Sequence, residues 1–242
     1  MPEVNRAQVT EVVGELASRS PEEILEWALQ SFGSRFAVVT AFQAEGIVIT
    51  DMARRLDPQV RVATVDTGRL PEETYEVIEA VRAQLRVGVE VIAPMAEDVE
   101  AMVTAHGPNL FRNDRALRQA CCHLRKVKPL NRFLGGLDAW ATGLRRDSGP
   151  SRGNVAKVEV DLAHGGMVKI NPLADWTKEQ VWDYIQGNRL PEHPLYRQGY
   201  TSIGCAPCTR AVLPGEGERA GRWWWESDEQ RECGIHQLFS GD

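Results

Sequence analysis

The 242-residue sequence lacks any long apolar run, and it also lacks a basic start followed by an apolar stretch. A membrane-spanning helix needs about 20 consecutive apolar residues, and a secretory signal peptide needs a basic start with an apolar core. Internal repeats and low-complexity tracts are missing too. We therefore expect a cytoplasmic protein that does not enter a membrane and is not built from repeats.

Net positive charge is also absent, because 28 Lys and Arg residues stand against 34 Asp and Glu residues, which gives −6. A protein that coats nucleic acid generally has the opposite balance, so we expect no nucleic-acid partner. Basic residues are nevertheless dense between 112 and 132 and between 145 and 152. Local basicity in an acidic chain indicates a small anionic ligand.

Cysteine is scarce, with five residues in the whole chain. An odd, small number in a reducing cytoplasm argues against a disulfide framework and favours metal ligation or redox catalysis. Two pairs stand out, Cys121 with Cys122 and Cys205 with Cys208, while Cys233 stands alone near the C-terminus. The pattern predicts four ligands and one reactive thiol.

The hydrophobic content of 43% is enough to bury a core of its own. We expect an α/β domain over residues 1–192, followed by a segment over 193–242 that is rich in Gly, Pro, Arg and Trp. Such a composition is typical of a lid or tail that a site organises, and less typical of an independent core.

Strand-like runs alternate with helical patterns along the first domain. Strands are predicted near 36–40, 61–65, 87–92 and 139–142, and helices near 20–32, 47–56 and 70–85. This alternation predicts a parallel twisted sheet with helices on both faces and a ligand at the carboxyl ends of the strands. The runs 155–160 and 167–170 predict a hairpin, and a capping box at 177–180 predicts a further helix.

The cysteine pairs differ in what they indicate. Cys121 and Cys122 would point about 100° apart on a helix, so they can bind one compact cluster only with a local bend or strain. The Cys205–Cys208 spacing alone fits zinc, iron–sulfur and redox sites, and its combination with adjacent cysteines favours an iron–sulfur cluster. The alternative is that Cys121 and Cys122 are buried apolar side chains.

Cys233 is followed by a flexible Gly234 and, three residues later, by His236. The glycine permits exposure of the thiolate and the imidazole offers it a proton partner, so Cys233 is predicted to be a nucleophile. A histidine without any role in the reaction is an equally simple explanation of His236.

Two loops follow predicted strands at the ligand edge. Thr40 opens a loop that keeps hydroxyl and helix-start donors but lacks the dense glycines that wrap a pyrophosphate, which favours a shorter sulfate–phosphate ester. Thr67 and Gly68 could hold an adenine or ribose. The simpler alternatives are a helix cap at Thr40 and a turn that caps the next helix at Gly68.

Cationic side chains complete the predicted site. Arg152 is the first choice for binding phosphate or sulfate, because a guanidinium offers paired donors to oxyanions. Arg145 or Arg146 could instead pair with Asp147. Lys126 lies four residues after Cys122, so on a continuing helix it would return to the face of the cysteines; a solvated surface lysine is the alternative.

Taken in order, these motifs resemble the assimilatory adenylyl-sulfate (APS) and phosphoadenylyl-sulfate (PAPS) reductase family over nearly the whole chain. The motifs are VDTGRL at 65–70, ATGLRRD at 141–147, SIGCAPCTR at 202–210, GRWWWE at 221–226 and ECGIH at 232–236. The resemblance implies the adenine nucleotide alpha hydrolase type of fold. It also implies the form with four cysteines, which carries a [4Fe-4S] cluster and usually prefers APS.

The resemblance further implies a reaction. The Cys233 thiolate would attack the sulfur of APS, expel AMP and become S-sulfocysteine, and thioredoxin or an equivalent dithiol protein would then release sulfite. We expect the reductant to be a separate protein, and a homo-oligomer is compatible with the sequence. The implied ligands of the cluster are Cys121, Cys122, Cys205 and Cys208. The implied substrate-binding residues are Thr40, Thr67, Gly68, Lys126, Gly143, Arg152, Arg219 and Arg222, with Lys126 and His236 as catalytic support.

Three alternatives remain at this stage. A PAPS reductase that keeps a cluster differs only in a pocket for the 3′-phosphate. A nucleotide-activating RNA-thiolating enzyme of the same fold is disfavoured by the acidic charge and the glycine-poor loop. An iron–sulfur sensor without enzymatic activity would need neither Cys233 nor the arginine-rich edge.

Overall fold

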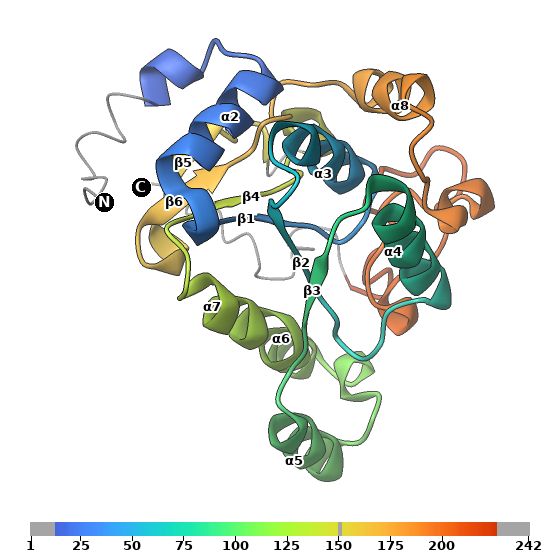
Figure 1. Ribbon diagram of the computed structural model, residues 1–242. Coiled ribbons are helices and arrows are strands. Elements are labelled where there is room, and N and C mark those ends of the chain that lie inside the picture. Colours follow the sequence, from blue (N-terminus) through green and yellow to red (C-terminus); the bar gives the residue numbers. More distant parts are fainter. Residues whose placement is uncertain (1–12, 150–151, 227–242) are drawn as a thin grey trace.

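A single six-stranded sheet forms the centre of the molecule (Figure 1). The computed structural model describes residues 13–149 and 152–226, so Cys233 and His236 lie outside the described residues. The strands follow the order β3-β2-β1-β4-β6-β5. Their bounds are β1 Phe36–Val39, β2 Arg61–Val65, β3 Val89–Ile92, β4 Ala139–Ala141, β5 Val158–Asp161 and β6 Met167–Ile170.

All neighbouring strands are parallel except β5, which pairs antiparallel with β6. The predicted α/β sheet is therefore confirmed, as is the predicted hairpin between β5 and β6. The chain leaves β1 for β2 on one side and returns to β4 on the other side. This reversal creates a switch point beyond the carboxyl ends of β1 and β4, where ligands of such sheets bind.

Helices cover both faces of the sheet (Figure 1). The α-helices are α2 Pro21–Phe32, α3 Ala44–Leu56, α4 Glu72–Leu85, α5 Ala96–His106, α6 Arg115–Cys122, α7 Lys128–Leu134 and α8 Lys178–Gly187. Capping boxes begin two of them, at Ser20 for α2 and Thr177 for α8, where a side-chain oxygen accepts from an otherwise unpaired amide.

Strand β1 shows how the two cores are separated. Phe36 and Val38 pack into the large core under α2, α3 and α4, whereas Ala37 lies in a smaller core with Leu130 and Leu134 of α7. Successive side chains of a strand point to opposite faces, so a strand that is covered on both faces is apolar at nearly every position. Because the strands are mostly apolar, the polar residues near the sheet lie in the loops at the ends of the strands.

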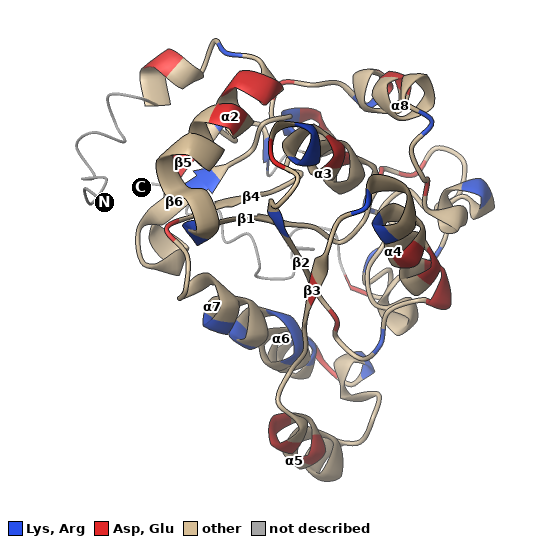
Figure 2. Cartoon of the chain, viewed as in Figure 1, with Lys and Arg blue, Asp and Glu red and all other residues tan. Residues whose placement is uncertain are grey.

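Between α6 and α7 the chain forms a π-helix at His123–Val127, directly after the adjacent cysteines. A π-helix is a rare local widening of the helical turn, and it is frequent at functional sites. The sequence argument required a local bend or strain at Cys121 and Cys122, and this segment provides an irregularity directly after them. Lys and Arg residues gather on α6 and α7, while acidic residues gather on α5 (Figure 2).

The described part of the C-terminal segment lies beside α4 (Figure 1). It contains short helical turns at Pro194–Gln198 and Ala206–Cys208 and little other regular structure. The Ile203 amide donates to the Gln43 side chain at 2.8 Å, which ties this segment to the loop after β1. Of the helices within the described ranges, none combines the length and apolar character that crossing a bilayer requires.

Candidate functional site

A cavity of about 330 Å³ opens beyond the carboxyl ends of β1 and β4, at the switch point of the sheet. The loop after β1, the loop after β4 and the C-terminal segment supply its walls, so residues far apart in sequence meet there. Six of the predicted substrate-binding residues line it, namely Thr40, Lys126, Gly143, Arg152, Arg219 and Arg222.

The loop after β1 is closely packed around Thr40. The Phe42 amide donates to the Thr40 hydroxyl at 2.8 Å, and Phe42 adopts a positive φ of 52°. A Cβ atom at Gly46 would lie 1.9 Å from Thr40 Oγ1, so only glycine fits there. The Ala44 amide at the start of α3 donates to the Tyr196 hydroxyl at 3.0 Å, and thus one helix-start donor already has a partner.

Gly143 permits a similarly close approach on the opposite wall. A Cβ atom at this position would lie 2.8 Å from Cβ of Glu45 and 3.4 Å from the Gly46 amide nitrogen. The loop after β4 can therefore lie directly against the start of α3. Larger side chains at Gly143 would push the two walls of the cavity apart.

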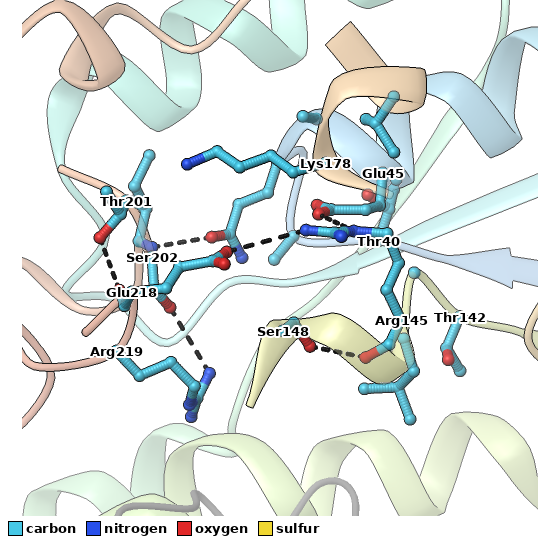
Figure 3. Close-up of a pocket in the computed structure, with 18 of the residues that line it drawn as sticks. Thr40, Glu45, Thr142, Arg145, Ser148, Lys178, Thr201, Ser202, Glu218 and Arg219 are labelled. Atoms are coloured by element: carbon cyan, nitrogen blue, oxygen red, sulfur yellow. Dashed lines mark hydrogen bonds and ion pairs between the residues drawn. The ribbon is translucent and has the colours of Figure 1, made fainter. Parts of the chain in front are cut away.

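Arg145 is buried in the cavity wall and is held by carboxylates (Figure 3). Its guanidinium donates to Glu45 at 2.9 Å and also pairs with Asp147, and it lies 3.9 Å from Glu218. Of the two alternatives drawn from the sequence, Arg145 and not Arg146 pairs with Asp147. Burial, followed by the nearby charge of Glu45, raises the pKa of Glu218 above its ordinary value.

Besides Arg145 and Lys178, four cations line the cavity, namely Lys126, Arg152, Arg219 and Arg222. Arg219 donates to the Ser202 hydroxyl at 3.5 Å (Figure 3). Arg152 donates to the Ser148 hydroxyl at 3.3 Å. Several guanidinium groups around one cavity suit a ligand that carries two oxyanion groups, because each guanidinium offers paired donors to such a group. The wall around Arg145 also carries carboxylates, so the cavity is lined by negative as well as positive groups.

A second, smaller pocket lies next to this cavity and is lined by Cys121, Cys122, Cys205 and Cys208. Cys122 is half-buried and the other three are buried. Cys122 and Cys205 are 83 positions apart in the sequence, so the fold brings two distant pairs of thiols to one place. Among residues 13–149 and 152–226, no three His, Cys, Asp or Glu side chains converge as a ready site for a single metal ion.

The thiols of this pocket have different electrostatic surroundings. Burial opposes ionisation of Cys205, but the charge of Lys126 and a hydrogen bond with Thr67 hold the pKa of Cys205 below its ordinary value. Burial, with the neighbouring Cys205 as a second cause, raises the pKa of Cys208 to about 12. Burial also raises the pKa of Cys121, against the effect of Arg125.

The loop after β2 packs against the cysteines and not against the large cavity. The Thr67 hydroxyl lies 3.2 Å from Cys205 Sγ, and the Thr67 carbonyl accepts from Arg125 at 2.7 Å. The Gly68 amide donates to Asp66 at 2.7 Å, as in a turn. Neither Thr67 nor Gly68 is among the residues that line the cavity.

The tryptophan run contributes one buried ring to the cysteine pocket. Trp223 is 1% exposed, whereas Trp224 is 36% exposed, so the three neighbouring indoles do not share one face. The Trp223 amide donates to the Cys208 carbonyl at 3.1 Å. Its indole nitrogen is buried and has no hydrogen-bond partner within the part of the chain that the structure describes.

Lys126 and Arg222 line both pockets. Each places a positive charge between the thiols and the larger cavity. Arg222 lies so close to Gly204 that a Cβ atom there would be 2.4 Å from its Nη2 atom. The two pockets are therefore adjacent and share these two cations in their walls.

Sequence reasoning did not identify Glu45, Glu218, Tyr196, Arg125 or Lys178, of which all but Arg125 line the cavity. Glu218 lies directly before Arg219 in the sequence. Its position next to a predicted substrate-binding residue was the only feature of the sequence that could have identified Glu218. Tyr196 gave none, because its contact with Ala44 joins positions 152 residues apart.

In comparisons with known proteins, this chain is similar to members of one family. The phosphoadenosine phosphosulfate reductase domain matches residues 35–211. A protein of Allochromatium vinosum named adenosine 5′-phosphosulfate reductase is 47% identical over 198 residues, covering 82% of this chain and 77% of that protein. A protein of Pseudomonas aeruginosa with the same name is 44% identical over 226 residues, covering 91% of this chain and 84% of that protein.

Among solved structures, a phosphoadenylyl-sulfate (PAPS) reductase from Candida auris in a phosphate complex is similar in fold. The TM-score is 0.73 at 29% identity, and the match covers 87% of this chain and 99% of the other. The similarity in fold therefore extends over most of this chain.

Proposed function

Since the chain belongs to the phosphoadenosine phosphosulfate reductase domain family, we propose that it is an enzyme of assimilatory sulfate reduction that reduces APS to sulfite and AMP. The relatives named for this activity match most of the chain at identities of 44% and 47%. The proposal extends the family assignment to this chain's own residues, taking the cavity as the substrate site and the four-cysteine pocket as the cofactor site.

One observation carries the assignment to these residues. The cavity of about 330 Å³ has a cation-lined wall, and two of its cations also line the pocket of four thiols. APS carries a sulfate joined to a phosphate, so it needs paired donors for two oxyanions at one end of a nucleotide. Arg152, Arg219 and Arg222 supply guanidinium groups, and Lys126 supplies a point charge beside the thiols.

The donor set of the smaller pocket fits a [4Fe-4S] cluster, whose four irons each take one cysteine thiolate. Ligands of this kind surround a core of several atoms, so they need not converge on a point as ligands of a single ion do. The buried, unpartnered indole N–H of Trp223 lines the same pocket and suits an acceptor such as sulfide. Cys121, Cys122, Cys205 and Cys208 would hold the cluster, which would supply negative charge and polarisation near the substrate.

The first chemical step belongs to Cys233, which lies outside the described residues. Its thiolate attacks the sulfur of APS, the bond between that sulfur and the phosphate oxygen breaks, and AMP leaves with the electron pair. Cys233 becomes S-sulfocysteine. Lys126 and the three arginines would stabilise the charge that develops on the leaving phosphate and on the sulfate oxygens, and His236 would hold the proton of the Cys233 thiol.

The second step needs two electrons from a dithiol protein such as thioredoxin. One thiolate of that protein attacks Cys233 Sγ and sulfite leaves with the electron pair of the S–S bond, so that a mixed disulfide forms. The second thiol of the reductant then resolves the mixed disulfide and restores the Cys233 thiolate. The protein's own residues return to their starting state after each turnover.

PAPS is the alternative substrate, and the solved relative from Candida auris is named for it. The carboxylates of Glu45, Glu218 and Asp147 surround Arg145 in the cavity wall, and these three outnumber the two cations there, Arg145 and Lys178. A second phosphate near this wall would meet net negative charge. The observation favours APS, whose ribose carries no 3′-phosphate.

The decisive experiment measures sulfite formed anaerobically from APS and, separately, from PAPS, with reduced thioredoxin and protein of known iron and acid-labile sulfide content. We expect turnover that favours APS, with about four irons per chain. Cys233→Ser should abolish sulfite formation while iron content stays the same. Absence of sulfite from both nucleotides in fully loaded protein would overturn the proposal, and faster turnover of PAPS would overturn the choice of substrate.

A further inference from the structure

Glu218 differs from the other carboxylates around Arg145 in how well its charge is satisfied. Arg145 donates to Glu45 at 2.9 Å and pairs closely with Asp147, so each of those carboxylates has a guanidinium in direct contact. The Glu218 carboxylate lies 3.9 Å from Arg145, which is beyond hydrogen-bond distance. Within the described part of the chain, no other donor hydrogen-bonds the two carboxylate oxygens of Glu218. These oxygens therefore remain available to a ligand.

Glu218 is also held at a defined place in the cavity wall. Its carbonyl accepts from the Thr201 hydroxyl at 2.5 Å, within the C-terminal segment. Its side chain is 28% exposed, lines the cavity and extends toward Arg145 (Figure 3). Because the backbone is held and most of the side chain is shielded from solvent, salt screens this charge less than it screens a charge at the surface.

The position of Glu218 in the chain relates it to the phosphate end of the ligand. Glu218 is directly followed by Arg219, and both side chains line the cavity. Neighbouring Cα atoms are about 3.8 Å apart. In APS the ribose is joined to the phosphate by a single ester linkage. A phosphate bound by Arg219 would therefore bring the ribose within reach of Glu218.

A carboxylate at this place interacts differently with the two candidate substrates. The ribose of APS carries free hydroxyl groups, and a hydroxyl can donate a hydrogen bond to an ionised carboxylate. PAPS carries a 3′-phosphate on the same ribose, and an ionised phosphate only accepts hydrogen bonds and repels a carboxylate at short range. An unsatisfied carboxylate thus attracts one nucleotide and repels the other, which is how a binding site rejects a close analogue.

We propose that Glu218 determines nucleotide specificity, by accepting hydrogen bonds from the ribose hydroxyls of APS or AMP and by repelling ligands that carry a 3′-phosphate. This inference rests on the proposed function and deepens it, because it assigns the rejection of PAPS to one carboxylate. Glu45 and Asp147 contribute less, since direct contact with Arg145 balances their charge. Burial, followed by the charge of Glu45, raises the pKa of Glu218, against the effects of Arg145 and Lys178, as expected of a carboxylate with too few partners.

The test compares the affinity of the full chain for AMP and for adenosine 3′,5′-bisphosphate, which differ only in the 3′-phosphate. Isothermal titration calorimetry gives both dissociation constants in protein of known iron content, without thioredoxin and without turnover. We expect the native protein to bind AMP at least about tenfold more tightly, because the added phosphate lies near a partly shielded charge of the same sign. Equal affinities, or tighter binding of the bisphosphate, would overturn the proposal.

Substitution of Glu218 supplies the second comparison. Glu218→Gln keeps the size and an acceptor oxygen, so we expect AMP affinity to stay within about threefold of native while affinity for the bisphosphate rises about tenfold. Glu218→Asp keeps the charge and should retain most of the native preference. Glu179→Gln, at an exposed position of α8 that does not line the cavity, should retain all of it. An unchanged preference in Glu218→Gln, or an equal loss in Glu179→Gln, would contradict the proposal.

Binding and turnover separate this inference from the proposed function. If the affinities behave as expected but no sulfite forms from APS or PAPS, then the proposed function fails and the role of Glu218 stands. If native protein forms sulfite from APS but Glu218→Gln keeps the native ratio of affinities, then the proposed function stands and Glu218 is not the determinant. The midpoint of urea unfolding checks that Glu218→Gln is folded, and Glu218→Ser takes its place if that midpoint falls.

Discussion

The hydroxyl of Thr67 lies 3.2 Å from the sulfur of Cys205, across 138 positions of sequence. The same hydroxyl accepts a hydrogen bond from the Arg69 amide at 3.2 Å, and it can donate its own hydrogen to Cys205 when that sulfur is a thiolate. Arg69 also accepts from the Ala206 amide through its carbonyl oxygen at 2.8 Å. The loop after β2 is therefore part of the cysteine site, and it contributes a donor that stabilises a thiolate.

Replacing Thr67 by Val should weaken the cysteine site without changing its shape. A hydrogen bond to a charged acceptor contributes about 1.5–3 kcal/mol, so we expect iron to be released roughly tenfold faster or more when a chelator is added. Loss of the cluster absorbance over time measures this. Thr67→Ser keeps the hydroxyl and should behave as the native protein does; equal release from the valine variant would show that the contact contributes nothing.

Lys126 should contribute to the reaction through its charge. Lys126→Gln removes the cation that lies between the cavity and the thiols, and we expect kcat/KM for APS to fall by about 100-fold. Steady-state sulfite formation gives the value. Lys128→Gln is the matched control, because Lys128 is an exposed lysine of α7 that pairs with Asp98. A similar loss in both variants would point to a general effect of charge on the protein.

Gly46→Ala should disrupt the loop after β1. The new Cβ atom would lie 1.9 Å from Thr40 Oγ1, so the loop must shift. Forcing an extra methyl group into a packed site costs about 1–3 kcal/mol, and we expect a lower midpoint in urea unfolding and weaker AMP binding. Gly88→Ala, at a position with open space around the added atom, should change neither measurement. Native AMP affinity in Gly46→Ala would mean that this loop does not shape the nucleotide site.

His193 should make the protein less stable in mild acid. It is fully buried, its Nδ1 accepts from the Leu195 amide at 3.3 Å, and burial lowers its pKa to about 4. Between pH 6.5 and 4 the unfolded chain binds the proton that the folded chain excludes. The stabilising contribution is thus complete above pH 6.5 and decreases toward pH 4, with a loss of about 2 kcal/mol at pH 5.

The measurement is urea unfolding at pH 7 and at pH 5. His193→Asn offers an acceptor for the Leu195 amide but has no group that titrates in this range, so its free energy of unfolding should fall less between the two pH values. Other groups contribute equally to both proteins. The same decrease in both would rule out His193 as the cause.

Much of the fold follows from local signals in the sequence. Ser20 with Glu23 and Thr177 with Gln180 predicted two helix starts, and both capping boxes are present. Local chemistry decides such features, because the cap and the amide it satisfies are three residues apart. The helix Ala96–His106 was not predicted, since only Met102 of this helix is buried and its apolar periodicity is correspondingly weak.

The sequence was less informative about the site, because tertiary contacts determine the partners of several of its side chains. Arg145 and Arg146 are adjacent and chemically identical, and only the folded chain shows that Arg145 turns inward to Glu45 while Arg146 donates to the Val155 carbonyl. Thr67 was predicted to contact the nucleotide because it ends a strand at the ligand edge. Its contact with Cys205 depends on how the C-terminal segment folds back, which no local pattern encodes.

Because the chain forms a π-helix at His123–Val127, changing the length of this stretch by one residue would alter the geometry of the cysteine site. A π-turn holds one residue more than an α-turn, so deleting one residue here would let a regular helix run from α6 into α7 without a break in hydrogen bonding. Because each residue of an α-helix turns the chain by about 100°, the deletion would rotate Cys121 and Cys122 away from Cys205 and Cys208 while every secondary-structure element survived. In this part of the chain a shortened sequence can thus fold normally and still lose its site.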